Sequence, residues 1–516
     1  MTHIVWFKKD LRLTDHFVLK EAIEASYEKA HDLILLYLYE DSIIAGEDVS
    51  RRHLLFINEC LKELSDQLAK LGQKLLIVRG EVIDIFSDIH SKNTIHSLWS
   101  HEETGNALTY ERDKKVSKWC KAHNVKWNEM PQHGVIRCLK NRNGWAAQWA
   151  KRMNRETLAI PEFPSKHHKQ FSLKCASIIA PEIFSKNSLG EQNLQRGGAM
   201  EAHRLIESFL GQRGKDYTKA MSSPVTAFDA CSRLSPYLTY GAMSVREAYH
   251  IGKHRQKVLK EATANSIDMD KKTLSSWRSA LRSFMGRLRW HCHFMQKLED
   301  EPELEWRNLF QACDGLREDE WNDDYYQAWA SGQTGYPMVD ACMRALIATG
   351  WINFRMRAML MSFSSYHLWL HWRQPGLHLA RLFTDYEPGI HWSQVQMQSG
   401  TTGINSIRVY SPTKQAMDQD PNGLFIRQWI PELKAIPDKY LHEPWKTPEL
   451  EQRMCGCVIG EDYPDPIVEH SSAYKDAQRK IRSVRKNDNK LERQKIYQRH
   501  GSRRRPGDAQ KRVATT

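Results

Sequence analysis

Residues 329–357 read WASGQTGYPMVDACMRALIATGWINFRMR, a glycine-rich turn followed by an apolar stretch. Gly332, Gly335 and Pro337 mark the turn, because glycine and proline punctuate regular structure. From Val339 onward the apolar residues recur at the spacing of one helical face. The stretch therefore predicts a turn, a helix that ends at the next glycine, and then the start of a second helix.

Two arginines, Arg355 and Arg357, open this second helix. A guanidinium group can contact a carboxylate or a phosphate through two parallel hydrogen bonds, so a binding role is one interpretation and a solvated helix face is the other. The whole stretch resembles the flavin-binding signature of the cryptochrome/photolyase family. That signature is a Trp, then G-x-T-G-Y-P-x-V-D-A-x-M-R, then T-G-W with paired arginines. The resemblance implies a non-covalently bound FAD.

The composition indicates a protein of at least two domains without a membrane span. The chain has 516 residues and contains no run of about 18 consecutive apolar residues and no signal-peptide pattern. We therefore expect a cytoplasmic protein, and a monomer. Its ten cysteines form no C-x-x-C pair, so no metal site is predicted. A cluster ligated by cysteines far apart in the chain stays open, although the C-terminal cysteine spacing of iron–sulfur members of the family is not evident.

The N-terminal part has the pattern of a parallel α/β domain. Short apolar runs at 4–7, 33–39, 75–78 and 95–99 alternate with helical stretches such as 53–71. The first run continues into WFKKDLRLTDH, which resembles the family's opening W-F-R-x-D-L-R-x-x-D-N, with His16 in place of the usual Asn. In the family this domain commonly holds an antenna chromophore, either a folate or a deazaflavin.

The rest of the chain predicts a connector, a helical domain and a tail. We expect the Rossmann-like α/β domain at 1–134, a polar connector at 135–200 and an all-helical FAD-binding domain at 201–470. The tail at 471–516 is strongly basic: from Lys475 onward fifteen Lys and Arg stand against four Asp and Glu, which accounts for +11 of the net charge of +13. Either a flexible solvated tail or added phosphate contacts to DNA would explain it.

Residues 209–246 contain a candidate phosphate-binding loop. The run CSRLSPYLTYG offers backbone N–H groups and hydroxyls at the start of a helix, which suits a pyrophosphate. It resembles the family's T-S-x-L-S-P-x-L-x-x-G segment, although Cys231 replaces the threonine and is a weaker donor. Across the chain the resemblance assigns FAD contacts to Tyr217, Ser232, Arg233, Leu234, Ser235, His291, Asn353, Arg357, Asp385 and Glu387.

Residues 382–415 match the loop that surrounds the flavin ring in the family. Asp385 and Glu387 fall at its D-x-D positions, and Arg357 matches the arginine that pairs with the first aspartate. His391 lies near the position that faces flavin N5, commonly Asn in photolyases. Alone, it could equally be a core histidine with satisfied hydrogen bonds.

The family also uses a chain of indoles that carries electrons from the surface to the flavin. Trp329 and Trp372 match its outer and middle members. The inner position aligns with Ser393 without a gap and with Trp392 with one, and we assign it to Trp392. Aromatic residues at helical spacing are otherwise explained by core packing.

Residues 283–299 depart from the pattern of cyclobutane-dimer photolyases. In place of E-[LI]-x-W-R-E-F the chain has RLRWHCH, which puts Arg287 at the lesion-contacting glutamate and His291 at a flavin-contacting arginine. Trp290 is kept, and Ala358 stands where many dimer photolyases have methionine. An exposed indole can stack a flipped base, and photolyases are among the enzymes known to flip bases.

The resemblance, which covers roughly residues 1–470, implies a photolyase that acts on UV-damaged DNA. Excited reduced FAD would donate an electron to a flipped pyrimidine lesion, with Arg287, Trp290 and Ala358 against the substrate. The departures at 287, 291 and 358 motivate an alternative, a cryptochrome-like photoreceptor without repair. A third class is a flavin-binding nucleic-acid protein without photochemistry. Lesion type, strand preference and antenna identity stay open.

Overall fold

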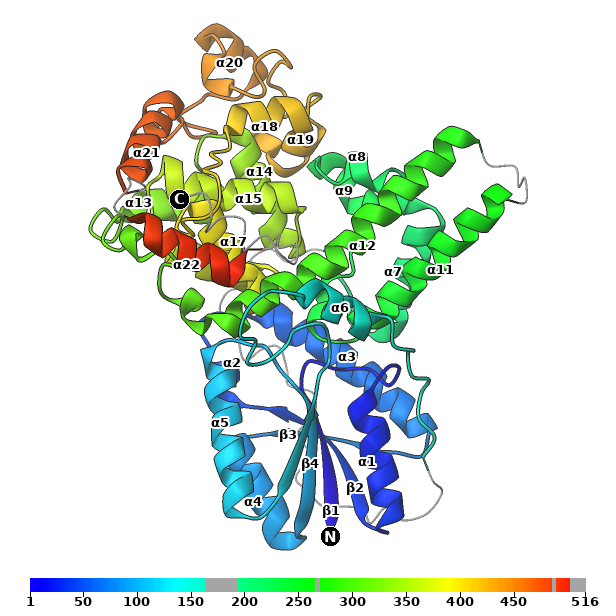
Figure 1. Ribbon diagram of the computed structural model, residues 1–516. Helices are drawn as coiled ribbons and strands as arrows, with labels where there is room; N and C mark the ends of the chain where they lie inside the picture. The colour runs from blue at the N-terminus through cyan, green and yellow to red at the C-terminus, as the bar shows by residue number, and fades with distance from the viewer. Residues whose placement is uncertain (164–192, 265–269, 485–488, 502–516) are drawn as a thin grey trace, which may run out of the picture.

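Five parallel strands form the N-terminal part of the molecule (Figure 1). They are β1 (Thr2–Phe7), β2 (Asp32–Tyr39), β3 (Leu75–Arg79), β4 (Ile95–His101) and β5 (Lys126–Met130), in the spatial order β3-β2-β1-β4-β5. The order reverses at β1, as in a doubly wound sheet, so the predicted α/β class is confirmed. The computed structural model describes residues 1–163, 193–264, 270–484 and 489–501.

Helices cover both faces of this sheet. They are α1 (Phe17–Glu28), α3 (Arg51–Lys70), α4 (Val82–Lys92) and α5 (Ala107–Ala122), with the short α2 (Asp41–Ile44) between strands. Alternate residues of β1 point to opposite faces. Val5 and Phe7 pack in the same core as α1 and α3, whereas Ile4 and Trp6 pack with α4 and α5. This double burial explains why β1 is apolar without interruption.

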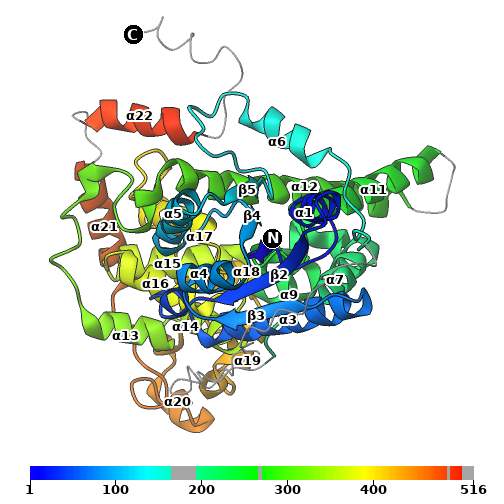
Figure 2. The same ribbon diagram turned by 90° about the horizontal axis from the view of Figure 1, so that it is seen from below.

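The second part is helical, as predicted (Figures 1 and 2). Its helices up to residue 300 are α7 (Ala199–Gly211), α8 (Tyr217–Ala220), α9 (Pro224–Ala230), α10 (Ser235–Thr239), α11 (Val245–Ala264) and α12 (Lys271–Asp300), and α6 (Trp145–Met153) lies in the connector. They are followed by α13 (Asp323–Ser331), α14 (Pro337–Thr349), α15 (Phe354–Ser362), α16 (Arg373–Leu382), α17 (Pro388–Ser399), α18 (Pro412–Gln419), α19 (Leu424–Trp429) and α20 (Glu449–Cys455). Within the described ranges, no helix has the length and apolar character needed to cross a membrane.

Part of the basic tail is folded, which differs from the expectation of a flexible segment. Helices α21 (His470–Val484) and α22 (Lys490–His500) lie against the helical part (Figure 1). Ala477 and Ile481 are four residues apart on one face of α21 and pack with Tyr366 and Trp369. An apolar stripe inside a basic sequence is therefore enough to hold this helix. Positions 485–488 and 502–516 of the predicted tail lie outside the described residues.

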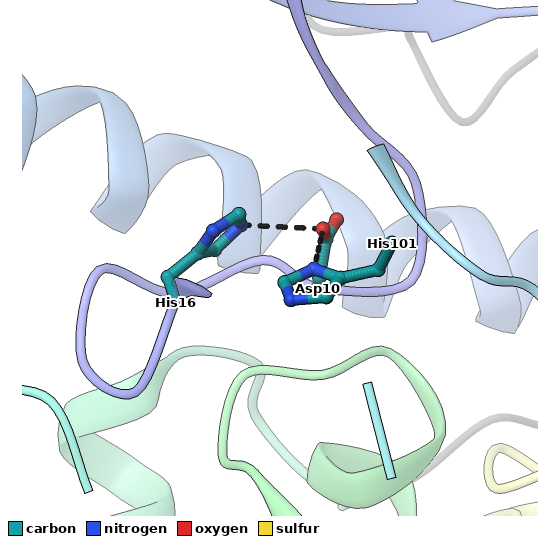
Figure 3. A group of neighbouring side chains, drawn as sticks. All are labelled: Asp10, His16 and His101. Carbon is teal, nitrogen blue, oxygen red and sulfur yellow. Dashed lines mark hydrogen bonds and ion pairs between the residues drawn. The ribbon is translucent and has the colours of Figure 1, made fainter. Parts of the chain in front are cut away.

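The loop after β1 joins the two parts through buried polar groups. Figure 3 shows the Asp10 carboxylate between two rings: His101 Nδ1 lies 2.6 Å and His16 Nε2 3.2 Å from the same oxygen. Burial would raise the pKa of Asp10, but the hydrogen bonds from both histidines outweigh it and hold the pKa well below its usual range. The same loop reaches the helical part, where Arg12 donates to the Gly241 carbonyl at 2.9 Å.

Asp10, His16 and His101 are close enough together to resemble a metal site, but their hydrogen bonds indicate a different role. His16 Nδ1 accepts the backbone N–H of Leu19 at 3.0 Å, so in the neutral ring Nε2 carries the proton. A metal would need a lone pair at that nitrogen. Burial lowers the pKa of His16 and keeps the ring neutral. The group is therefore a hydrogen-bonded network that fixes the loop between β1 and α1, residues 8–16, which we call the docking loop.

Buried histidines make the fold sensitive to acid. Burial lowers the pKa of nine of them to between about 3 and about 4: His3, His53, His101, His133, His291, His293, His367, His378 and His391. In the unfolded chain these rings regain a pKa near 6.5, so below that pH the unfolded state binds more protons. Burial raises the pKa of Glu305 to about 7, so the folded state binds one proton there that the unfolded state releases. This single proton offsets part of the effect of the histidines.

We therefore expect the free energy of unfolding to fall as the pH drops from about 6.5 toward 4. The loss is on the order of 1 kcal/mol per histidine for each pH unit. Urea midpoints at pH 7.5, 6.0 and 5.0 measure it, and His391→Gln should reduce the slope by about one proton. A midpoint that stays level from pH 7.5 to 5.0 would contradict the assignment of neutral buried rings.

Candidate functional site

A cavity of about 570 Å³, open at its mouth, lies between α15, α17 and the loop that joins α16 to α17. Five of the site residues predicted from the sequence, from two separate segments, line this cavity: Arg357, Ala358, Asp385, Glu387 and His391. The remaining lining residues are Phe354, Met361, Leu379, Phe383, Tyr386, Ile390, Gln394, Val395 and Gln398. The fold thus brings residues 27 to 34 positions apart in sequence to one wall.

Arg357 and Asp385 form a bidentate ion pair at the cavity wall. Two guanidinium nitrogens donate to the two carboxylate oxygens at 2.9 Å each, and the Asp385 side chain is only 4 % exposed. The guanidinium also stacks 4.1 Å from the centre of the Phe383 ring. Burial would raise the pKa of Asp385, but Arg357 outweighs it and lowers the pKa below the usual value. Asp385 is therefore a fixed negative charge that faces a mostly apolar cavity.

Glu387 holds the second carboxylate of the cavity and caps the start of α17. Burial raises its pKa, and the ammonium group of Lys9, 3.4 Å from Oε2, opposes that effect. Lys9 belongs to the docking loop of the α/β domain, and no sequence pattern predicted that it lies here. The feature of the sequence that could have identified Lys9 is its position directly before Asp10, in a loop that reaches the helical part. Glu387 couples the cavity to the other domain.

The predicted phosphate-binding segment lies between α9 and α10. Tyr217 begins α8, Leu234 is buried, and Ser235 helps to lower the pKa of Asp385. Ser232 and Arg233 occupy the turn itself, where Arg233 has a left-handed backbone with φ of +61°. The Arg233 guanidinium lies 4.1 Å from the centre of the Trp351 ring. This contact links the segment to the T-G-W part of residues 329–357.

Several buried polar atoms around this region have no partner among the described residues. They are Asn353 Oδ1, Arg233 Nε, Glu387 Oε1, Gln394 Oε1, Trp392 Nε1 and both ring nitrogens of His291. Buried polar groups without hydrogen bonds are rare and indicate a missing partner. The set contains donors and acceptors, as a flavin with its ring N–H, carbonyls and hydroxyl chain requires. The residues present therefore fit FAD. Asn353 is oriented by donating its Nδ2 to the Ser222 carbonyl at 2.7 Å.

His391 lies in the cavity wall with a defined tautomer. Its Nε2 is 2.8 Å from the Gly376 carbonyl, so this nitrogen carries the proton and donates. Burial lowers its pKa to about 4, which keeps the ring neutral at pH 7. The ring lies 5.0 Å from Trp392 and 5.1 Å from Tyr386, centre to centre. His391 can therefore offer Nδ1 as an acceptor.

Three predicted electron-transfer tryptophans are fully buried. The rings of Trp392 and Trp372 lie 5.8 Å apart at an angle of 69°, close enough for direct contact of their edges. Trp372 Nε1 donates to Asn308 at 2.7 Å. Trp329, matched to the outer member, is 0 % exposed and donates to the Leu360 carbonyl at 3.1 Å. It therefore does not lie at the surface that its outer position implied.

Of the residues predicted to contact a lesion, Ala358 lines the cavity and Arg287 contacts its rim. Arg287 is exposed on α12, and its guanidinium lies 5.8 Å from the ring of Phe354, which lines the cavity and is 44 % exposed. Trp290, three residues further on the same helix face, is 46 % exposed. Ala358 is buried in the cavity wall. Phe354 was not among the site residues predicted from the sequence. The feature that could have identified it is its position as an aromatic residue directly before Arg355.

A second cavity, of about 930 Å³ including its mouth, opens in the α/β domain. Aromatic rings of Trp6, Tyr37 and Tyr39 and the charged groups of Lys8 and Arg112 line it. Tyr386 lines both cavities and donates its hydroxyl to Asp48 at 2.6 Å. The two cavities therefore share this lining residue.

Two family models match consecutive parts of the chain. Residues 3–161 match DNA photolyase, and residues 284–483 match the FAD binding domain of DNA photolyase. The chain is 28% identical over 492 residues to a deoxyribodipyrimidine photo-lyase of Alkalihalophilus pseudofirmus, which covers 92% of this chain and 96% of the relative. It is 25% identical over 538 residues to Cryptochrome-1 of Aedes aegypti, which covers 97% of this chain and 95% of the relative.

The fold agrees with these matches. A solved structure of a bacterial class III photolyase from Agrobacterium tumefaciens superposes with a TM-score of 0.75 at 24% identity and covers 94% of this chain and 97% of that one. The helical part is an FAD-binding domain, as the resemblance implied. From its two matched domains, its relatives and its fold, the chain belongs to the photolyase/cryptochrome family.

Proposed function

We propose that this protein is a blue-light-driven DNA photolyase that splits UV-induced pyrimidine lesions. The observation that carries the proposal is the open mouth of the FAD cavity, where exposed Phe354 contacts exposed Arg287, and exposed Trp290 lies three residues after Arg287 on α12. Exposed aromatic rings next to a cationic group suit a base that is flipped out of a duplex and the phosphate that follows it. A photoreceptor that never binds DNA has no need of them.

The residues of the cavity have separate tasks in this proposal. Arg357 and Asp385 fix the flavin ring through its N–H, Asn353 and His391 contact the ring edge, and the Ser232–Ser235 turn holds the pyrophosphate. When bound, FAD supplies the light-excited electron that splits the lesion and receives it back. Trp392 and Trp372 deliver electrons that keep the cofactor reduced. His291 and Ala358 leave room at the mouth for the damaged bases.

The second cavity supports an antenna chromophore in the α/β domain. Its aromatic walls suit a flat conjugated ring such as that of a folate or a deazaflavin, while Lys8 and Arg112 are paired with carboxylates of the protein. Because Tyr386 lines both cavities, a chromophore there would be close enough to pass excitation energy to FAD.

A cryptochrome-like photoreceptor is the second candidate. The folded tail favours it, because α21 packs on Tyr366 and Trp369 and could transmit a change from the helical part. Both proposals share FAD and the indoles, but only the first requires repair.

Repair of damaged oligonucleotides tests the choice. Protein reduced in the dark is mixed with single- or double-stranded DNA that carries a cyclobutane dimer or a 6–4 product, and is then given blue light. Light-dependent loss of either lesion supports the photolyase and identifies its substrate. FAD binding with no loss of either lesion would reject repair and favour the photoreceptor.

Replacing Trp290 with alanine should weaken binding to damaged DNA and leave FAD binding unchanged. Stacking of a base on an aromatic ring is worth about 1–3 kcal/mol, so affinity should fall roughly 10- to 100-fold. Fluorescence anisotropy with a labelled lesion duplex measures the change. Trp306→Ala is the matched control, because Trp306 is 40 % exposed but lines a different surface pocket. Equal affinities for the two variants would show that Trp290 does not contact the lesion.

A further inference from the structure

Three histidines meet at the edge of the sheet that lies away from the helical part of the molecule. His3 lies in β1, His31 directly before β2, and His96 in β4. Strands β2 and β4 flank β1 in the parallel sheet, so the amino ends of all three lie side by side (Figure 1). The three ring centres are 5.2, 5.2 and 4.9 Å apart. Only the sheet topology brings these residues together, because they are far apart in sequence.

Two of these rings present nitrogens at the separation of ligands on one metal ion. His3 Nε2 and His31 Nδ1 lie 3.2 Å apart. Zn–N bonds of about 2.0–2.1 Å at the tetrahedral angle place two ligand nitrogens about 3.3 Å apart. His3 is buried, and Ser97 Oγ lies 2.6 Å from its Nδ1 and can accept the proton of that nitrogen, which leaves the lone pair at Nε2. A hydrogen bond between the two rings would give the same distance, so the third ring decides the interpretation.

The third ring, His96, already directs a lone pair at a cation. The ammonium group of Lys29 lies 2.9 Å from His96 Nε2, and because an ammonium group can only donate, this nitrogen accepts. Burial lowers the pKa of all three histidines, and the charge of Lys29 lowers each pKa further. The ammonium group therefore lies near all three rings, and the rings are neutral at pH 7, which is the form that binds a metal. Lys29 is exposed, so its side chain can turn into solvent.

We propose that His3, His31 and His96 bind one divalent transition-metal ion in the place of the Lys29 ammonium group. Imidazole ligands suit Zn²⁺ and its neighbours Co²⁺, Ni²⁺ and Cu²⁺, and a water molecule completes a tetrahedral Zn²⁺ site. Asp32 directly follows His31, and its charge raises the pKa of that ring against the other effects, so a carboxylate adds negative charge beside the ion. The ion joins the amino ends of three strands. The site lies apart from the FAD cavity and does not depend on the proposed function.

A second group of histidines in the same domain provides a matched control. The rings of His90 on α4 and His123 directly after α5 lie 5.3 Å apart. His90 Nδ1 accepts the backbone N–H of Ile95 at 3.3 Å, and His123 Nδ1 donates to the Trp119 carbonyl at 2.9 Å. This pair therefore has two rings in place of three, and one nitrogen of each ring is already engaged. His123→Ala removes a histidine that should not contribute to tight metal binding.

Metal titration of the full-length chain, prepared without a histidine tag, tests the proposal. Co²⁺ is the probe, because a tetrahedral site gives this ion an intense visible absorption, and Zn²⁺ then competes for the same site. We expect one bound ion per chain in the wild type and in His123→Ala. His96→Ala should weaken binding at least about tenfold, since one of three ligands is lost. Lys29→Met should tighten binding about tenfold, because a competing positive charge is removed.

The Lys29→Met variant keeps the test decisive, because misfolding cannot raise the affinity for a metal. If the wild type gives no visible absorption with Co²⁺, or if His96→Ala binds as tightly as the wild type, the proposal is wrong. Equal weakening in His96→Ala and His123→Ala would show adventitious binding to surface histidines only. Binding in Lys29→Met that is no tighter than in the wild type would contradict the position of the ion among these three rings.

Discussion

Arg357→Leu is expected to abolish tight FAD binding and to destabilise the protein, because the Asp385 carboxylate loses its partner. Removal of one partner from a buried ion pair costs about 3–5 kcal/mol, and we expect the lower end because the Arg357 side chain is 23 % exposed. The carboxylate would then take up a proton or turn away from the flavin. Either response removes the charge that we assign to the ring N–H, so FAD affinity should fall at least about 100-fold.

Two comparisons make this result specific to the site. Arg344→Leu removes a similar pair with Glu432, 2.8 Å apart but with side chains 21% and 33% exposed, and should cost at most about 1 kcal/mol. The double variant R357L/D385N removes both charges and should regain much of the stability without regaining FAD. Urea unfolding of the apo protein and titration with FAD measure the two quantities separately. Wild-type FAD affinity in R357L would remove the ion pair from the binding site.

The strands and the cofactor segments were predictable because each has a local signature. Apolar runs gave β1 to β4, and glycine with proline marked the turn before α14. β5 was missed, because its sequence KWNEM is polar and each residue is at least partly exposed at the edge of the sheet. The hydrophobic pattern of a sequence identifies strands whose side chains are buried. It does not identify an edge strand such as β5, which is held by backbone hydrogen bonds to β4.

The parts that could not be predicted depend on contacts between distant segments. Lys9 pairs with Glu387 across 378 positions in sequence, and no periodic pattern connects them. The burial of Trp329 depends equally on residues that only the tertiary fold brings together. Family resemblance supplied the order of the indoles but not their distance from solvent. Charge also misled the prediction for the tail, where Ala477 and Ile481 form an apolar stripe that a net charge of +11 conceals.

Trp392→Phe is expected to slow light-driven reduction of bound FAD by at least about tenfold, or about 1.4 kcal/mol of activation free energy. Trp392 is the ring that links the cavity to Trp372: it touches His391 of the cavity wall at 5.0 Å and Trp372 at 5.8 Å. Phenylalanine preserves most of the apolar volume but is much harder to oxidise than indole. The rate is followed by the loss of flavin absorbance under blue light with a thiol present.

The control and the alternative position of the inner indole complete the test. Trp277→Phe changes another buried tryptophan, which is 4 % exposed. Trp277 lies near the start of α12 and packs against Arg255 of α11, so its replacement should leave the rate unchanged. Ser393, the other alignment of the inner position, hydrogen-bonds the Phe294 carbonyl at 3.5 Å and has no aromatic ring to oxidise. Since the Trp392 Nε1–H donor has no acceptor among the described residues, its removal leaves no acceptor unsatisfied, and a slower rate reports electron transfer. Equal rates in Trp392→Phe and Trp277→Phe would exclude Trp392 from the path and leave Trp372 to supply the cofactor directly.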